Sequence, residues 1–366
     1  MVTSTAAAQV SGGATVSPTG SKSITGGQYE EIVRVLRPLV ESYGVSGMEA
    51  PVRATVERLL PRQIRRETDS AGNLWVTLGQ GDPTVVFIAH LDEVGFRVSA
   101  INDDGSLELE EVGGIFPSLW EAKAALVQTE RGTVPAVFIP RDSTDAGHPM
   151  HSPPKLRADV GSSSREASAA LGITVGNTLT MPKQFVRLAG SRATGRSFDD
   201  RVGSAAQILA VRRLDPAHLR HRVIFIWSVR EEVGLEGAQA AAHALGLRTA
   251  RVHAIDTFVS ADSPLEISTF AVAPLGQGAV ARALDNSSVT PPAYVDSLIQ
   301  VARRHQIPLQ VGTTNGGNDG SVFGDYGIPD VPIGWPLRYA HSPAETIDLR
   351  DVESLAELIR AVAEDW

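Results

Sequence analysis

The chain has 366 residues, 42% of them hydrophobic and 20% charged, and it carries a formal net charge of −9. Its length allows two domains or one large α/β domain with an insertion, and its acidic balance argues against nucleic acid or an anionic membrane as the main partner. The absence of cysteine excludes disulfides, thiolate metal ligands and a cysteine nucleophile.

The N-terminal segment 1–27 is rich in serine, threonine, glycine and alanine, with neither a basic start nor a continuous apolar stretch. It does not have the pattern of a signal peptide. Such a composition buries too little apolar surface to offset the entropy of ordering, so we predict a disordered tail. The longest apolar runs fall far short of the roughly 20 residues that a membrane helix needs. We therefore expect a cytoplasmic protein without a membrane partner.

Helices and strands are predicted to alternate directly after the tail. Apolar residues at helical spacing indicate a helix over 29–44, and a second helix is expected at 50–60. A turn and a strand follow at 69–79. The apolar run 84–89 is typical of a buried strand.

Residues 98–192 have the pattern of a small, mostly β module. Short β-like segments at 106–112, 124–130 and 134–140 are separated by turn residues, and one short helix is expected at 164–171. Because a small module cannot easily cover its own sheet, exposed strand edges would favour pairing between copies. We therefore expect the module to mediate self-association.

The α/β pattern returns after Thr194. Helices are predicted at 199–214, 237–245, 291–305 and 351–366, and extended segments at 222–229, 251–256 and 331–339. Strands that alternate with helices indicate an α/β fold with a mainly parallel sheet sandwiched by helices. This domain would be discontinuous, formed by 28–97 and 193–366, with 98–192 inserted as a small β-rich domain.

Histidines and carboxylates gather where the expected strands end. Ligands of open α/β sheets bind outside the carboxyl ends of the strands, so side chains at these points are candidates for a site. The candidates are His90, Asp92, Glu231, Glu232, Asp256 and His341, together with the pair Asp199 and Asp200 at the start of a helix.

Each candidate also has a purely structural interpretation. Asp199 could be a helix N-cap, Glu231 and Glu232 could be solvated loop charges, and Asp256 could cap a turn. Taken together, these structural interpretations explain the pattern less well, because neighbouring strands lie only about 4.8 Å apart and bring the side chains close together. Several carboxylates gathered at that spacing would repel one another, and a cation is the simple remedy.

The residue types suit a site for two metal ions. Two histidines, two aspartates and one glutamate are ligands for Zn²⁺, Co²⁺ or Mn²⁺, and one carboxylate must bridge because paired metals lie about 3.5–4 Å apart. Asp92 follows His90 by two residues and could accept the other imidazole N–H. Glu231, beside the ligand Glu232, remains as a general base. His148 and His151, in a loop of the module, fit a metal role less well.

Seven segments, in this order, make the chain similar to the tetrahedral aminopeptidases. That family of dinuclear metallo-aminopeptidases includes glutamyl, leucyl and lysyl enzymes and proteins mislabelled as endoglucanases or cellulases. The segments run from Gly44 to Val352 and read GVSGMEAPVR, DSAGNLWV, AHLDEVGF, GRSFDDRVG, VREEVGLEGA, AIDTFVSAD and RYAHSPAETIDLRDV. The resemblance implies a zinc-exopeptidase-like fold.

The resemblance also implies a distribution of metal ligands. The equivalents of His90, Asp199 and Asp256 hold one metal ion in the family. The equivalents of Asp199, Glu232 and His341 hold the other, so that Asp199 bridges the pair.

Further roles follow from the same resemblance. The equivalent of Glu231 is the general base, and that of Asp92 supports the histidine. The family's β-rich insertion is a dimerisation domain, which implies a homo-oligomer, either a dimer or a dimer-based dodecamer. One departure lies at 318–320, where Asn-Asp-Gly replaces the family's Thr-Asp-Ala next to the substrate.

We therefore expect an aminopeptidase that hydrolyses N-terminal residues of peptides, with two Zn²⁺ or Co²⁺ ions, or Mn²⁺, a bridging water and a glutamate base. A deacylase or carboxypeptidase on the same scaffold is the nearest alternative. A glycosidase would instead use two carboxyl groups about 5–9.5 Å apart and no transition metal. A non-enzymatic binding protein with a decayed site ranks lowest, because every expected ligand and the base are present.

Overall fold

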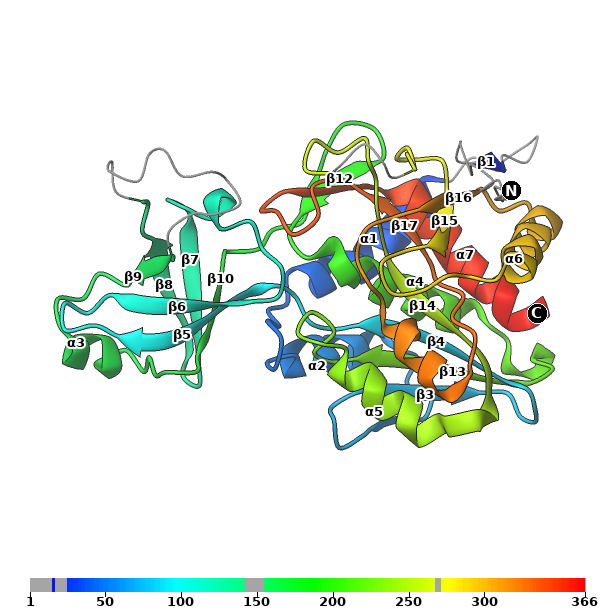
Figure 1. The fold of residues 1–366 in the computed structure, drawn as a ribbon, viewed down its shortest axis with the longest axis horizontal. Coiled ribbons are helices and arrows are strands. Elements are labelled where there is room, and N and C mark those ends of the chain that lie inside the picture. The colour runs from blue at the N-terminus through cyan, green and yellow to red at the C-terminus, as the bar shows by residue number, and fades with distance from the viewer. Residues whose placement is uncertain (1–14, 17–24, 142–154, 267–270, 366) are drawn as a thin grey trace, which may run out of the picture.

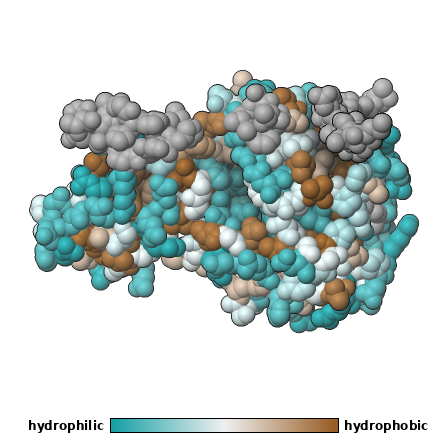
Figure 2. Space-filling model, in the orientation of Figure 1, coloured by the Kyte–Doolittle hydropathy of each residue, from teal (hydrophilic) through white to brown (hydrophobic). Residues whose placement is uncertain are grey.

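The computed structural model describes residues 15–16, 25–141, 155–266 and 271–365. A large α/β part and a smaller β part lie side by side (Figure 1). On the face drawn in Figure 2, hydrophilic side chains predominate and hydrophobic ones lie in small separate groups. Among the helices of the described residues, none combines the length and apolar character needed to cross a membrane.

Nine strands form the sheet of the large part, in the order β1-β16-β15-β17-β14-β4-β13-β3-β2. They are β1 (Thr15–Val16), β2 (Arg66–Thr68), β3 (Leu74–Leu78), β4 (Thr84–His90), β13 (Arg222–Ser228), β14 (Thr249–Val259), β15 (Ala279–Leu284), β16 (Leu309–Thr313) and β17 (Ile333–Leu337). The central strands β17, β14, β4 and β13 run parallel. Antiparallel pairs flank them, β15 with β17 and β3 with β13.

The sheet is therefore mixed, and the expectation of a mainly parallel sheet holds for its centre and for the pair β15 and β16. The short turn between β2 and β3 leaves no room for a crossover, so these strands pair antiparallel at one edge. The other edge is β1, which pairs antiparallel with β16.

Helices cover both faces of the sheet, as alternate residues of β4 show. Val85, Phe87 and Ala89 join one apolar cluster, whereas Val86 and Ile88 join another. The first cluster includes helices α1 (Gly26–Val40), α2 (Ala50–Leu59), α4 (Phe198–Arg213), α6 (Pro292–His305) and α7 (Leu349–Asp365). The second includes α5 (Glu236–Leu245) and the 3₁₀ segment η5 (Asp319–Tyr326). The apolar periodicity of the sequence thus predicted all six α-helices of this part.

The ordered chain begins earlier than expected. Thr25 caps α1 and shares a capping box with Gln28, so the helix starts inside the segment assigned to a disordered tail. Two further tail residues, Thr15 and Val16, pair with β16. The rest of the segment 1–27 lies outside the described residues.

The smaller part is a closed barrel of six strands in the order β10-β5-β6-β9-β8-β7. They are β5 (Gly95–Ile101), β6 (Leu107–Val112), β7 (Ala124–Thr129), β8 (Gly132–Phe138), β9 (Arg157–Asp159) and β10 (Thr178–Thr180), with α3 (Arg165–Ala170) beside them. Phe96, Trp120 and Phe138 pack edge-on or tilted in its core. Closure pairs every strand of the barrel, so the expected exposed strand edges are wrong for these residues. His148 and His151 lie outside the described residues.

A three-stranded sheet connects the segment that leaves the barrel after β10 to the large part. It consists of β11 (Val186–Arg187), β12 (Arg192–Gly195) and β18 (Glu345–Asp348). The register pairs Gly195 with Glu345. The chain leaves β12 and enters α4 within three residues, so this small sheet fixes where α4 begins.

Candidate active site

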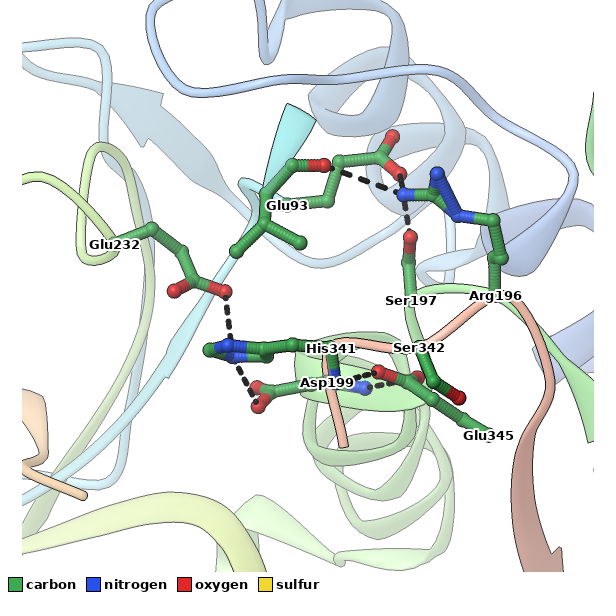
Figure 3. A pocket seen from close by; sticks show the side chains of 9 residues that line it. Glu93, Arg196, Ser197, Asp199, Glu232, His341, Ser342 and Glu345 are labelled. Atoms are coloured by element: carbon green, nitrogen blue, oxygen red, sulfur yellow. Dashed lines mark hydrogen bonds and ion pairs between the residues drawn. The ribbon is translucent and has the colours of Figure 1, made fainter. Parts of the chain in front are cut away.

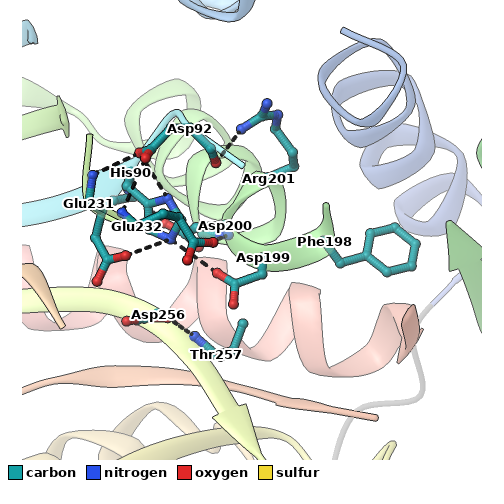
Figure 4. Close-up of polar contacts among 12 residues, drawn as sticks. His90, Asp92, Phe198, Asp199, Asp200, Arg201, Glu231, Glu232, Asp256 and Thr257 are labelled. Atoms are coloured by element: carbon teal, nitrogen blue, oxygen red, sulfur yellow. Dashed lines mark hydrogen bonds and ion pairs between the residues drawn. The ribbon is translucent and has the colours of Figure 1, made fainter. Parts of the chain in front are cut away.

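The candidate residues converge at one end of the central strands (Figure 4). His90 ends β4 and pairs in register with Ser228, the last residue of β13, so Glu231 and Glu232 emerge beside it. Asp256 lies inside β14, which continues to Val259, so the strand does not end at this aspartate as expected. Its neighbour in register on β17 is Gly334, where a Cβ atom would collide with the Asp256 carbonyl.

The pair Asp199 and Asp200 divides two roles between two adjacent carboxylates. Both residues have non-helical backbone angles at the start of α4. Asp200 accepts hydrogen bonds from the backbone N–H of Gly203 at 3.1 Å and of His90 at 2.9 Å. The capping interaction therefore belongs to Asp200, and the side chain of Asp199 faces His90 and His341 instead.

Asp199 lies between the two histidines, with one carboxylate oxygen toward each. Its Oδ1 is 3.1 Å from Nε2 of His90, and its Oδ2 is 3.5 Å from Nε2 of His341. Glu232 Oε1 also lies 3.5 Å from Nε2 of His341. Two ligands bound to a tetrahedral ion at about 2.0–2.2 Å are roughly 3.4 Å apart. The spacing of these side chains therefore fits ligands that share metal ions.

Three groups of donor atoms lie within 4.8 Å of one another among the described residues. His90, Asp199 and Asp256 form one group, and Asp199, Glu232 and His341 form a second. A third combines His90 with Glu231 and Glu232. The first two groups match the ligand sets implied by the sequence resemblance, and they share Asp199.

The electrostatics of these residues indicate a deficit of positive charge. Burial, with the nearby charge of Asp199, raises the pKa of Glu232 to about 8 and that of Asp256 to about 6. Burial also raises the pKa of Glu231 well above its usual range. Asp199 is the exception, because its hydrogen bonds to His341 and His90 outweigh burial and lower its pKa. A bound cation would supply the missing charge, so the donor set fits divalent metal ions.

Asp92 links the end of β4 to the residues that follow β13. Its Oδ1 accepts the backbone N–H of Glu231 at 3.0 Å, and its Oδ2 accepts that of Glu232 at 3.2 Å and the hydroxyl of Ser46 at 2.6 Å. Nδ1 of His90 lies 3.4 Å from Asp92 Oδ1. Asp92 thus faces the histidine as expected, at a distance longer than an ordinary hydrogen bond, and it also fixes the backbone at both glutamates, which was not expected.

Glu231 lies beside the first metal group without belonging to it in the expected scheme. Its Oε2 is 4.0 Å from Nε2 of His90. No contact of Glu231 with His341 is found in the described residues, whereas Glu232 contacts that histidine directly. Both glutamates nevertheless lie near His90 in the third group, so what separates them is the contact of Glu232 with His341.

Two residues near the site were given no role from the sequence. Arg282, in β15, is buried and pairs with Asp256 Oδ2 at 3.2 Å and with Asp285 Oδ2 at 3.0 Å. Glu345 lines a pocket with Asp199, Glu232 and His341 (Figure 3). Glu345 stands in the RYAHSPAE segment, which was the available signal, whereas nothing in the sequence around Arg282 indicated its pairing with Asp256.

Comparisons with known proteins find aminopeptidases. The family model described as M42 glutamyl aminopeptidase matches residues 72–358. A lysyl aminopeptidase from Pyrococcus furiosus is 30% identical over 344 residues, covering 90% of this chain and 96% of the relative. A putative aminopeptidase from Acetivibrio thermocellus is 30% identical over 339 residues, covering 90% of this chain and 98% of the relative.

Solved structures show the same similarity. The TET1 peptidase from Pyrococcus horikoshii, described as assembling into a tetrahedron or a large octahedral shell, is 33% identical with a TM-score of 0.84. The match covers 92% of this chain and 100% of that one. A structure from Thermotoga maritima described as an endoglucanase is 26% identical with a TM-score of 0.72, covering 90% of this chain and 96% of that one. The endoglucanase label thus occurs among the structural relatives, as the sequence resemblance implied.

Proposed function

The chain belongs to the M42 glutamyl aminopeptidase family of peptide hydrolases, and from this premise we propose a metal-dependent aminopeptidase with a dinuclear site. The observation that carries the proposal is the position of Asp199, whose two carboxylate oxygens face His90 and His341 separately. A carboxylate in that position can bridge two ions about 3.5–4 Å apart.

The proposed ligands fall into two groups that share the bridging residue. His90, Asp199 and Asp256 would hold one ion, and Asp199, Glu232 and His341 the other. When bound, the two ions would polarise the scissile carbonyl and lower the pKa of the attacking water. Imidazole and carboxylate donors suit Zn²⁺ or Co²⁺ first and Mn²⁺ second.

Glu231 is the proposed general base. It would take a proton from the attacking water and deliver it to the leaving amine, which needs a carboxylate beside the ions that is not itself a ligand. The support for this role is that Glu231 lies 4.0 Å from His90 while Glu232 contacts His341. Asp92 would orient both His90 and the backbone that carries Glu231.

The reaction is tested with free and blocked peptides of the same sequence. An aminopeptidase should release the first residue of a peptide with a free amino terminus and leave its N-acetylated counterpart intact. Turnover of the acetylated peptide from its other end would support a carboxypeptidase. Release of the acyl group would support a deacylase.

Metal dependence separates the proposal from a glycosidase. Chelation should abolish hydrolysis of aminoacyl p-nitroanilides, and Zn²⁺, Co²⁺ or Mn²⁺ added back one at a time should restore it, which also ranks the metals. A glycosidase with two catalytic carboxyl groups would be unaffected by a chelator. Cleavage of a β-glucan that resists chelation would contradict the proposal.

We also propose that the protein is a homo-oligomer formed through the barrel. The barrel exposes large apolar side chains, with Val137 47%, Leu171 42% and Val175 63% accessible in the single chain. Such side chains mark an interface where they form one contiguous patch. A relative of the same fold forms a tetrahedral shell, so a dimer or a dimer-based dodecamer is expected by light scattering. A monomer at micromolar concentration would contradict this.

A further inference from the structure

Glu345 is a buried carboxylate whose hydrogen bonds all go to backbone groups of the site. Only 2% of its surface is exposed. Oε2 accepts the backbone N–H of Phe198 at 2.6 Å and of Asp199 at 3.3 Å. Oε1 accepts the backbone N–H of His341 at 2.9 Å. One oxygen therefore holds the segment of Asp199, and the other holds the segment of His341.

These two segments need an external support because they are irregular. Ser197 and His341 both have left-handed backbone angles, with φ of 60° and 57°, and Tyr339 has φ of 64°. A left-handed conformation is unfavourable for a non-glycine residue, so it persists only where surrounding contacts fix it. The hydrogen bonds of Glu345 are contacts of this kind, at the two points where the chain presents metal-binding side chains.

Glu345 is itself fixed by strand pairing. It is the first residue of β18 and pairs in register with Gly195 of β12. β12 leads directly into the segment that Glu345 holds. The position of the carboxylate is therefore set by the sheet and does not depend on a bound ion.

We propose that Glu345 is a positioning residue that pre-forms the metal group Asp199–Glu232–His341; this inference rests on the proposed dinuclear function. It acts through the backbone and does not itself ligate an ion. Both of its oxygens are needed, one for each segment. Without them, two of the three ligands of this group lose the hydrogen bonds that align them before an ion binds.

Glu345→Gln is the discriminating substitution. Glutamine has the same shape but one acceptor oxygen, and its amide NH₂ would point at a backbone N–H. It can therefore support only one of the two segments. Glu345→Asp keeps both acceptor oxygens with a shorter reach, so it should restore part of the function that glutamine loses.

The matched control is Asp348→Asn. Asp348 is in the same strand and 1% exposed, but its partners are Ser191 and Arg350, neither of which is a candidate ligand. A merely structural effect of losing a buried carboxylate in β18 should appear in both variants. An effect on metal binding should appear only at Glu345.

The test is a titration of metal-free protein with Zn²⁺, followed by Co²⁺ absorption spectra of the same variants. Wild type should bind two ions. Glu345→Gln should bind one of them on the order of 10–100-fold more weakly, with an altered Co²⁺ spectrum for that ion, and Asp348→Asn should match wild type. If Glu345→Gln does not fold, Glu345→Asp carries the test with a smaller loss at the same ion.

The outcomes separate this inference from the proposed function. Two ions bound by Glu345→Gln as tightly as by wild type, or by Glu345→Asp where Glu345→Gln does not fold, would overturn the positioning role alone, as would equal losses in Asp348→Asn. Wild type that binds fewer than two ions would overturn the dinuclear function and the positioning role with it.

Discussion

The carboxylate of Asp92 accepts the backbone N–H of Glu231 at 3.0 Å. This hydrogen bond connects the end of β4, where His90 lies, to the residue proposed as base. The other oxygen of Asp92 accepts the N–H of Glu232. A single buried aspartate therefore fixes the backbone of two adjacent glutamates, both near His90, of which Glu232 also contacts His341. That arrangement lets neighbours in the sequence take separate chemical roles.

The first prediction separates Glu231 from Glu232. Glu231→Gln keeps size and hydrogen bonding but cannot accept a proton, so it should retain two metal ions and lose on the order of 10²–10⁴ in turnover. Glu232→Gln removes a charged ligand, so it should lose one ion, and excess metal should restore part of the activity. Metal content by mass spectrometry, measured beside turnover, checks both variants.

Two results would contradict this assignment. If Glu231→Gln loses an ion while Glu232→Gln stays fully loaded, the two roles must be exchanged. If both variants remain as active as wild type, the glutamates are solvated loop charges and the proposed mechanism fails at this point.

A second prediction concerns Asp92 and its two acceptor oxygens. Asp92→Asn leaves one acceptor for the two backbone N–H groups of Glu231 and Glu232, so both metal affinity and turnover should fall about 10–100-fold. Ser46→Ala is the control, because it removes one hydrogen bond to Asp92 and leaves the carboxylate in place. An Asp92→Asn variant no weaker than Ser46→Ala would show that the aspartate does not organise the site.

The site could be predicted from the sequence where each residue acts through its own side chain. His90 is the last residue of the wholly buried strand β4. Such a strand can be recognised in the sequence because its apolar residues run without interruption. Glu345 could not be assigned a role, because it acts on backbone N–H groups that leave no trace in the residue pattern. Asp199 and Asp200 were distinguished from the sequence only by the resemblance, which made Asp199 the bridging ligand, and the structure adds that Asp200 makes the capping interaction.

Elements with a complete apolar periodicity were predicted from the sequence. The prediction missed a strand in which a buried charge interrupts that periodicity. No strand was expected at β15, which reads AVARAL with the charged Arg282 in its interior. In the structure this arginine is neutralised by Asp285, three residues further along the chain, and by Asp256 of β14. The pairing with Asp256 depends on tertiary packing and cannot be inferred from local composition.

A third prediction revises the boundary of the dispensable tail. A protein that starts at Thr25 should keep the turnover number of wild type, because the described contacts of residues before Thr25 lie at β16 and away from the site. A protein that starts at Gln28 lacks the N-cap of α1 and should be about 1 kcal/mol less stable than the Thr25 form. Chemical denaturation of the two truncations measures the difference. Equal stability would show that the capping box contributes nothing, and a large loss of turnover from Thr25 would assign the tail a role in catalysis.

A fourth prediction concerns Glu93, which lies in the segment that links β4 of the large part to β5 of the barrel. Its buried carboxylate pairs with Lys183 at 2.5 Å and Arg196 at 3.1 Å, with Arg201 nearby. Burial alone would raise its pKa, but these three cations outweigh burial and lower it to about 2. Because the unfolded value is 4.5, the pairing stabilises the protein above pH 4.5, and this stabilisation is lost as the pH falls from 4.5 toward 2. The shift corresponds to about 3 kcal/mol.

The comparison of Glu93→Gln with wild type tests this pH dependence in metal-free protein. At neutral pH the variant should be about 3–5 kcal/mol less stable, because two buried arginines lose their counterion together with Lys183, whose pKa burial lowers to about 7. The difference between the two unfolding free energies should shrink as the pH falls below 4.5, since wild type then loses what the variant already lacks. Lys183→Met serves as the control, because Glu93 keeps Arg196 as its partner and the loss should be smaller. If the difference in unfolding free energy stays constant across this pH range, the ionised form of Glu93 is not what stabilises the link between the two parts.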